Sequence, residues 1–189
     1  MRNLGKIIYI TGGARSGKSS FAESEIFKSE KERIYVATSL TFDDEMKERV
    51  KLHKIQRGEE WITIEEYKNI EKYLEPYKSQ EKIVLLDCLT NMVSNNMIMD
   101  RPVDWDTISQ EELQKIEKEI EIQVEKIISF IKESSLDMIV VSNEAGMGLI
   151  PPYALGRYFR DICGKMNQIV AKNSEEAYLV VSGLTLKLK

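Results

Sequence analysis

The sequence feature that most constrains the fold is a segment near the start of the chain, TGGARSGKS, from Thr11 to Ser19. It matches the pattern GxxxxGK[ST], with Gly12 as the first glycine, Gly17 and Lys18 as the central pair and Ser19 as the hydroxyl residue. An apolar run precedes the segment and a helical pattern follows it. The segment therefore predicts a strand that leads through a phosphate-binding loop (P-loop) into a helix, the arrangement that binds a purine nucleoside triphosphate.

The chemistry of such a loop accounts for the residue types found in it. Glycines let backbone N–H groups approach phosphate oxygens, and the N-terminus of the helix adds partial positive charge. Lys18 is expected to neutralise the β and γ phosphates, and Ser19 to bind a Mg²⁺ ion that bridges phosphate oxygens. We therefore expect the nucleotide to contact the whole loop: Gly12, Gly13, Ala14, Arg15, Ser16, Gly17, Lys18 and Ser19.

A second candidate for the Mg²⁺ site is Asp87, which ends the apolar run KIVLLD. P-loop enzymes use an acidic residue at the end of a neighbouring strand to hold the hydration shell of the metal. Aspartate also occurs at strand ends because it favours turns. The intact P-loop favours the metal-binding interpretation.

Short apolar runs alternate with helical patterns along the chain, which is typical of an α/β fold. The helical stretch after Ser109 starts with a capping box that includes Glu112, and Pro151 and Pro152 are expected to open another helix. We predict one P-loop NTPase-like domain over residues 1–189, with a mostly parallel central sheet and helices on both faces. The strands are expected at residues 6–11, 33–38, 82–87, 137–142 and 177–182, with a short extension at 185–189.

Composition excludes several classes of function. No apolar run reaches the ~20 residues needed to span a membrane, and no signal peptide precedes the first strand, so we expect a cytoplasmic protein. The net charge is −4, with basic and acidic residues interspersed, which disfavours nucleic-acid binding. Cys88 and Cys163 are expected to be buried free thiols, since they form no CxxC pair.

His53 is the only histidine in the chain and follows an acidic run, Asp43 to Glu45, that is suited to a helix N-terminus. Two interpretations are open. It is either a structural or surface histidine of that helix, or a nucleophile whose neutral imidazole attacks phosphorus to give a phosphoramidate. The segment has no second histidine or cysteine, so a metal site is not indicated.

The residues described so far, taken with further segments, resemble a known family. The chain is similar to the bifunctional adenosylcobinamide kinase / adenosylcobinamide-phosphate guanylyltransferases of cobalamin biosynthesis. The resemblance covers essentially the whole chain and is carried by ITGGARSGKSSFAE, YVATSLTFDDEMKERVKLHK, LLDCLTNMVSN and SNEAGMGLIPP followed by GRYFRD.

The resemblance implies two reactions. ATP or GTP phosphorylates adenosylcobinamide, and GTP then guanylylates a histidine, which falls on His53, before GMP passes to adenosylcobinamide phosphate to give adenosylcobinamide-GDP. It also implies a homo-oligomer, such as a trimer. Besides the P-loop, it places nucleotide contacts at Thr38, Ser39, Arg57, Glu65 and Asp87.

Other features leave questions open. Gly58 stands where the family usually has proline, and Leu52 stands where some relatives carry a second histidine. The segment SNEAGMG is expected near either the corrinoid or the triphosphate. Two competing functions also remain: a P-loop small-molecule kinase that never guanylylates, and a protein that binds nucleotide without catalysis.

Overall fold

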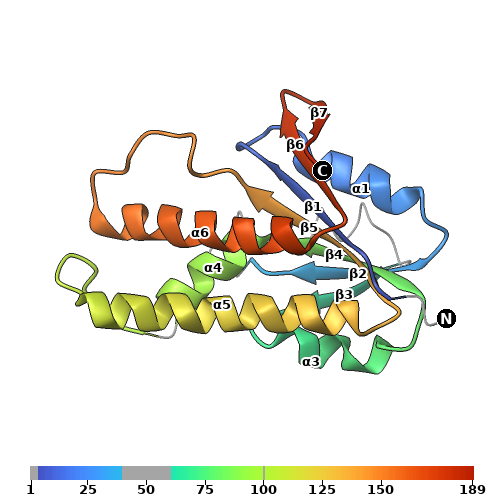
Figure 1. Cartoon of the computed structure of the whole chain (residues 1–189), viewed down its shortest axis with the longest axis horizontal. Coiled ribbons are helices and arrows are strands. Elements are labelled where there is room, and N and C mark those ends of the chain that lie inside the picture. The colour runs from blue at the N-terminus through green and yellow to red at the C-terminus, as the bar shows by residue number, and fades with distance from the viewer. Residues whose placement is uncertain (1–3, 40–60, 100) are drawn as a thin grey trace.

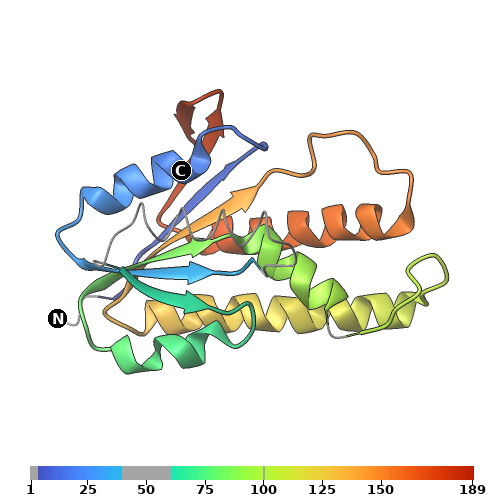
Figure 2. The same cartoon turned by 180° about the vertical axis from the view of Figure 1, so that it is seen from behind.

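The computed structural model describes residues 4–39, 61–99 and 101–189. Within these residues, seven strands form one central sheet in the order β3-β2-β4-β5-β1-β6-β7 (Figures 1 and 2). All neighbouring pairs are parallel except β6 and β7, which form an antiparallel hairpin. The strands are β1 Ile7–Gly12, β2 Glu32–Ala37, β3 Trp61–Glu65, β4 Lys82–Asp87, β5 Asp137–Asn143, β6 Glu176–Val181 and β7 Leu184–Lys187.

Helices lie on both faces of the sheet (Figures 1 and 2). One face carries α1, and the other carries α3, α4, α5 and α6. This arrangement confirms the predicted α/β fold with a mostly parallel sheet. The helices are α1 Lys18–Phe27, α3 Ile70–Leu74, the short 3-10 helix η2 Glu75–Tyr77, α4 Leu89–Ile98, α5 Gln110–Lys132 and α6 Ala154–Asn173.

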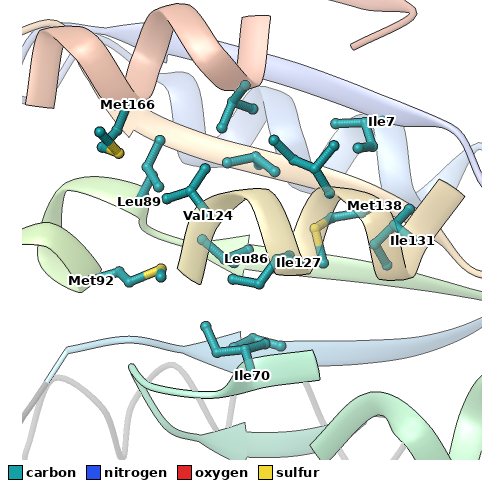
Figure 3. Close-up of a cluster of buried hydrophobic side chains, with 14 of the residues drawn as sticks. Ile7, Ile70, Leu86, Leu89, Met92, Val124, Ile127, Ile131, Met138 and Met166 are labelled. Atoms are coloured by element: carbon teal, nitrogen blue, oxygen red, sulfur yellow. The ribbon is translucent and has the colours of Figure 1, made fainter. Parts of the chain in front are cut away.

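Two hydrophobic cores follow from the alternation of side chains along the strands. In β2, Ile34 and Val36 face the side of the sheet that carries α3, α4, α5 and α6. Tyr35 and Ala37 of the same strand pack on the other side, with α1. The larger core lies between the sheet and α3–α6, where Figure 3 shows Leu86 of β4 close to residues such as Ile127 of α5. Because both faces of each central strand are buried, these strands are continuously apolar, as in other parallel sheets.

The predicted helix after Ser109 is confirmed as α5. The Ser109 hydroxyl accepts a hydrogen bond from the Glu112 amide at 3.2 Å, which caps the helix. The buried face of α5 includes residues spaced three or four apart, Ile116, Ile120, Val124, Ile127 and Ile131. No helix in the described parts of the chain is both long and apolar enough to cross a membrane.

Three elements differ from the expectations. β3, a short strand at one edge of the sheet, was not predicted, and neither was α4, which follows the strand that ends at Asp87. The helix after Pro151 and Pro152 begins only at Ala154, because Tyr153 has an extended backbone and forms the N-cap. The helix expected after Asp43 lies outside the described residues.

Candidate active site

The P-loop connects the carboxyl end of β1 to the N-terminus of α1, as predicted. Gly17 has a φ of 95°, a left-handed conformation that favours glycine. A Cβ on Gly12 would lie 2.4 Å from the carbonyl oxygen of Val180, so β6 leaves no room for a side chain there. The Gly183 amide, in the β6–β7 turn, donates to the Ser16 carbonyl at 2.7 Å. The loop is thus held in shape by its neighbours in the sheet.

Lys18 is the first residue of α1, at the end of the loop, and is buried. Its Nζ donates to the carbonyl oxygen of Gly13 at 3.0 Å, and no ion pair forms at Lys18 within the part of the chain that the structure describes. Burial lowers the pKa of Lys18, while the nearby acidic groups of Cys88 and Asp87 act in the opposite direction. A buried ammonium whose partner is a neutral carbonyl fits a polyphosphate, which would supply the missing negative charge.

Ser19 and Asp87 are the two residues predicted to bind Mg²⁺. Ser19 is exposed in the first turn of α1, and Asp87 is half-buried at the carboxyl end of β4. The Tyr35 hydroxyl donates to Oδ2 of Asp87 at 3.1 Å and fixes one side of the carboxylate. The described residues contain no cluster of three or more His, Cys, Asp and Glu suited to a metal ion. The Ser19 hydroxyl and the Asp87 carboxylate nevertheless suit Mg²⁺, which usually binds through one or two protein oxygens together with phosphates and water.

Thr38 is buried beside Asp87, with only 1% of its surface exposed. Its hydroxyl donates to the Cys88 carbonyl at 2.7 Å and accepts from the Cys88 amide at 2.8 Å. Its backbone is also engaged, because its amide donates to the Asp87 carbonyl and its carbonyl accepts from the Asn95 side chain at 2.6 Å. The Thr38 side chain therefore holds the turn after Asp87 through two hydrogen bonds of its hydroxyl, and the nucleotide contact that the family resemblance implied for Thr38 stays a prediction.

Polar contacts also bind the end of β5 to the P-loop. The Glu144 amide donates to the Gly12 carbonyl at 3.0 Å. The Asn143 side chain donates to the Thr90 hydroxyl at 2.9 Å, and the Asn167 side chain donates to the Asn143 carbonyl at 3.2 Å. These bonds join β1, β5, α4 and α6 at the carboxyl edge of the sheet, where ligands of such folds bind.

A model of the family described as cobinamide kinase / cobinamide phosphate guanyltransferase matches residues 8–188 of this chain. The chain belongs to this family. The match includes the P-loop, Asp87 and every strand and helix of the described fold except for the first residue of β1, and it confirms the resemblance drawn from the sequence motifs.

Curated relatives of this cobinamide kinase family member are similar to it over nearly its whole length. The bifunctional adenosylcobalamin biosynthesis protein CobU of Escherichia coli (strain K12) is 38% identical over 188 residues, covering 97% of this chain and 99% of the relative. The bifunctional adenosylcobalamin biosynthesis protein CobP of Pseudomonas aeruginosa is 33% identical over 180 residues, covering 95% of each chain. The similarity is thus not confined to the nucleotide-binding motif.

Solved structures with little sequence similarity share the fold. A protein of Pyrococcus horikoshii OT3, Project ID PH0250, has a TM-score of 0.54 at 8% identity and covers 99% of this chain and 87% of its own. An ATPase from the type III secretion system of pathogenic bacteria has a TM-score of 0.53 at 11% identity, covering 97% of this chain and 58% of its own. These likenesses concern the fold alone and confirm its P-loop NTPase-like class.

The remaining predicted site residues of this family member lie in different places. Glu65 is exposed at the carboxyl end of β3, in register with Ala37 of β2, which in turn pairs with Asp87. Glu65 thus lies at the same edge as Asp87, about 10 Å away by strand spacing. Ser39 is half-buried directly after Thr38. His53 and Arg57 lie outside the described residues.

Sequence reasoning missed two residues that shape the site. Tyr35 resembles any other core residue of a buried strand, and its hydrogen bond to Asp87 depends on the pairing of β2 with β4. Asn95 lies on α4 and binds the Thr38 carbonyl. The run of asparagines in this segment was the available signal, because buried amides in a helix need hydrogen-bond partners.

Proposed function

We propose that this chain carries out both reactions of its family: phosphorylation of adenosylcobinamide by ATP or GTP, and transfer of GMP from GTP to adenosylcobinamide phosphate. The observation that carries the proposal is the buried Lys18 in a complete P-loop with Asp87 nearby, in a chain that matches bifunctional relatives over nearly its full length. The nucleotides and corrinoids are substrates, and Mg²⁺ is the cofactor.

In the kinase reaction, the backbone amides of the P-loop and Lys18 bind the triphosphate and neutralise the charge that develops on the γ-phosphoryl group. Ser19 and Asp87 would hold Mg²⁺, which supplies additional charge neutralisation when it is bound. The hydroxyl of adenosylcobinamide attacks the γ-phosphorus and releases its proton to solvent, and the bond between that phosphorus and the β–γ bridging oxygen breaks. The products are the phosphate ester and a nucleoside diphosphate.

In the guanylyl-transfer reaction, the imidazole of His53 attacks the α-phosphorus of GTP. A nitrogen–phosphorus bond forms, the bond to the β-phosphate oxygen breaks, and pyrophosphate leaves. A phosphate oxygen of adenosylcobinamide phosphate then attacks the same phosphorus and releases His53. We propose that Arg57 stabilises the negative charge at that phosphorus, and that Glu65 and Ser39 bind the nucleotide.

Two substitutions separate these reactions. Lys18→Ala should abolish both activities, because both use the same triphosphate site, whereas His53→Ala should lose only GMP transfer. Phosphorylation of adenosylcobinamide and formation of adenosylcobinamide-GDP are measured separately, with circular dichroism to verify folding. A folded His53→Ala variant that loses phosphorylation to the same extent would disprove the shared-site mechanism. Normal GMP transfer by that variant would exclude His53 as the nucleophile, whereas native protein that phosphorylates adenosylcobinamide but transfers no GMP would leave the kinase-only function.

We also propose that the protein forms a homo-oligomer, such as a trimer, through the hairpin at the C-terminal end of the sheet. β7 pairs only with β6 among the described strands, and Leu184, Leu186 and Leu188 are exposed on it or directly after it. An exposed apolar edge strand favours association. Light scattering should show a smaller particle for Leu186→Lys than for native protein, with Leu4→Lys as a control; an unchanged mass would exclude this contact.

A further inference from the structure

The loop between β5 and α6, residues 144–153, exposes several large apolar side chains. Leu149 is 96% exposed, Met147 79%, Ile150 71% and Tyr153 61%. Single exposed apolar residues are common, but a group of four within seven residues is typical of a binding surface. The cores of the sheet contain none of these four side chains, so the fold itself gives no reason for their apolar character.

This apolar loop starts at the phosphate site. Asn143 pairs with Gly12 in the β1–β5 register, and the Glu144 amide is bonded to the Gly12 carbonyl. From there the loop leaves the carboxyl edge of the sheet and arches over to the far end of α6 (Figure 1). Leu149 is five residues beyond Glu144, so it lies at most about 18 Å from the P-loop contact. One ligand can therefore contact both the apolar loop and the terminal phosphate of a bound nucleotide.

The far end of the loop is held in place. Nη1 of Arg157 donates to the carbonyl of Pro152 at 2.7 Å and to that of Pro151 at 3.3 Å. Gly156 lies under the ring of Tyr153, where a Cβ would come within 2.6 Å of Cε2. These contacts and the fixed φ of two consecutive prolines order the end of the loop before a ligand arrives.

We propose that Met147, Leu149, Ile150 and Tyr153 form the subsite for the ring of the corrinoid acceptor. This inference rests on the proposed function, in which the acceptor must bring a short polar arm, ending in a hydroxyl or a phosphate, to the nucleotide. A corrin ring is a broad, methyl-bearing body, and it offers apolar surface at a distance from that arm. Apolar side chains beside a polar phosphate site match this division of the ligand.

The test is equilibrium dialysis of adenosylcobinamide, which absorbs visible light, against native protein and the double variant Leu149→Gln/Ile150→Gln. Both side chains are exposed, so folding should be unaffected. The expected result is binding weakened about tenfold or more. Leu4→Gln is the matched control, because Leu4 is also exposed but precedes β1 at the opposite edge of the sheet. Equal binding by the native protein and the double variant would overturn the subsite.

Two further measurements distinguish the possible failures. GTP alone should guanylylate the double variant as fast as the native protein, because that step needs no acceptor. Native protein that binds adenosylcobinamide through this loop but forms no guanylyl adduct would contradict the guanylyl-transfer part of the proposed function and leave the subsite intact. If the double variant changes the oligomeric mass in light scattering while corrinoid binding is unchanged, the loop is a subunit contact and the subsite proposal is wrong.

Discussion

Replacing Thr38 by valine tests whether this residue stabilises the fold or contacts nucleotide. Valine has nearly the same shape, so the change removes the hydroxyl without leaving a cavity. The buried amide of Cys88 then loses its partner, at a cost of about 1–3 kcal/mol, and the Cys88 carbonyl loses one of its bonds, at a cost of about 1 kcal/mol. That carbonyl keeps its helical bond from the Met92 amide. The expected loss of unfolding free energy is therefore about 2–4 kcal/mol.

Urea and thermal unfolding measure this loss directly. For a chain of this length the melting temperature should fall by roughly 4–16 °C. Nucleotide affinity of the folded Thr38→Val variant should stay within about threefold of native, because the hydroxyl is turned to Cys88. Thr63→Val is the control, since Thr63 is exposed on β3 and should change stability by less than about 0.5 kcal/mol. Native stability combined with a large loss of nucleotide binding would refute this interpretation of Thr38.

Three further predictions concern the P-loop and the thiols. Gly12→Ala should lower the unfolding free energy in urea by roughly 1–3 kcal/mol, since the new Cβ would lie 2.4 Å from a carbonyl oxygen of β6. Gly13→Ala is the control and should change stability little, because there is open space around its Cβ. Equal effects of the two substitutions would contradict this geometry. Burial lowers the pKa of Lys18 from its usual value of 10.5, so its ammonium loses its proton at a pH below 10.5. Nucleotide affinity in a fluorescence titration should therefore start to fall below pH 10.5, and constant affinity up to that pH would contradict the lowered pKa. Burial raises the pKa of both thiols, so Ellman's reagent should label Cys88 and Cys163 only after unfolding, and rapid labelling of native protein would show that they are accessible.

Much of the fold could be predicted because local and long-range signals agree. The apolar runs before Gly12 and up to Asp87 are strands in the structure, since strands buried on both faces need continuous apolar sequence. α5 was recognised from its capping box, and the Ser109 hydroxyl does accept from the Glu112 amide. The P-loop was identified because its geometry depends on glycines at fixed positions, and Gly17 does have the left-handed conformation.

The elements that were missed depend on tertiary contacts. α4 contains Asn, Ser and Thr, which are poor helix formers, and it is buried over most of its surface, so packing against the sheet determines its conformation. β3 has only five residues and pairs on one side only, with β2. The hydrogen bonds between Thr38 and Cys88 could not be predicted either, because Cys88 is fifty residues away in the sequence and the contact follows from the pairing of β2 with β4.

The central claim is that His53 becomes covalently guanylylated, and intact-protein mass spectrometry tests it most directly. Native protein and His53→Ala are incubated with GTP and Mg²⁺ and analysed at neutral or alkaline pH, because phosphoramidates are labile in acid. We predict an added mass equal to one GMP moiety on the native chain and none on the variant. A folded native chain that binds GTP and shows no such adduct would contradict the claim, and the protein would then be a kinase without guanylyl transfer.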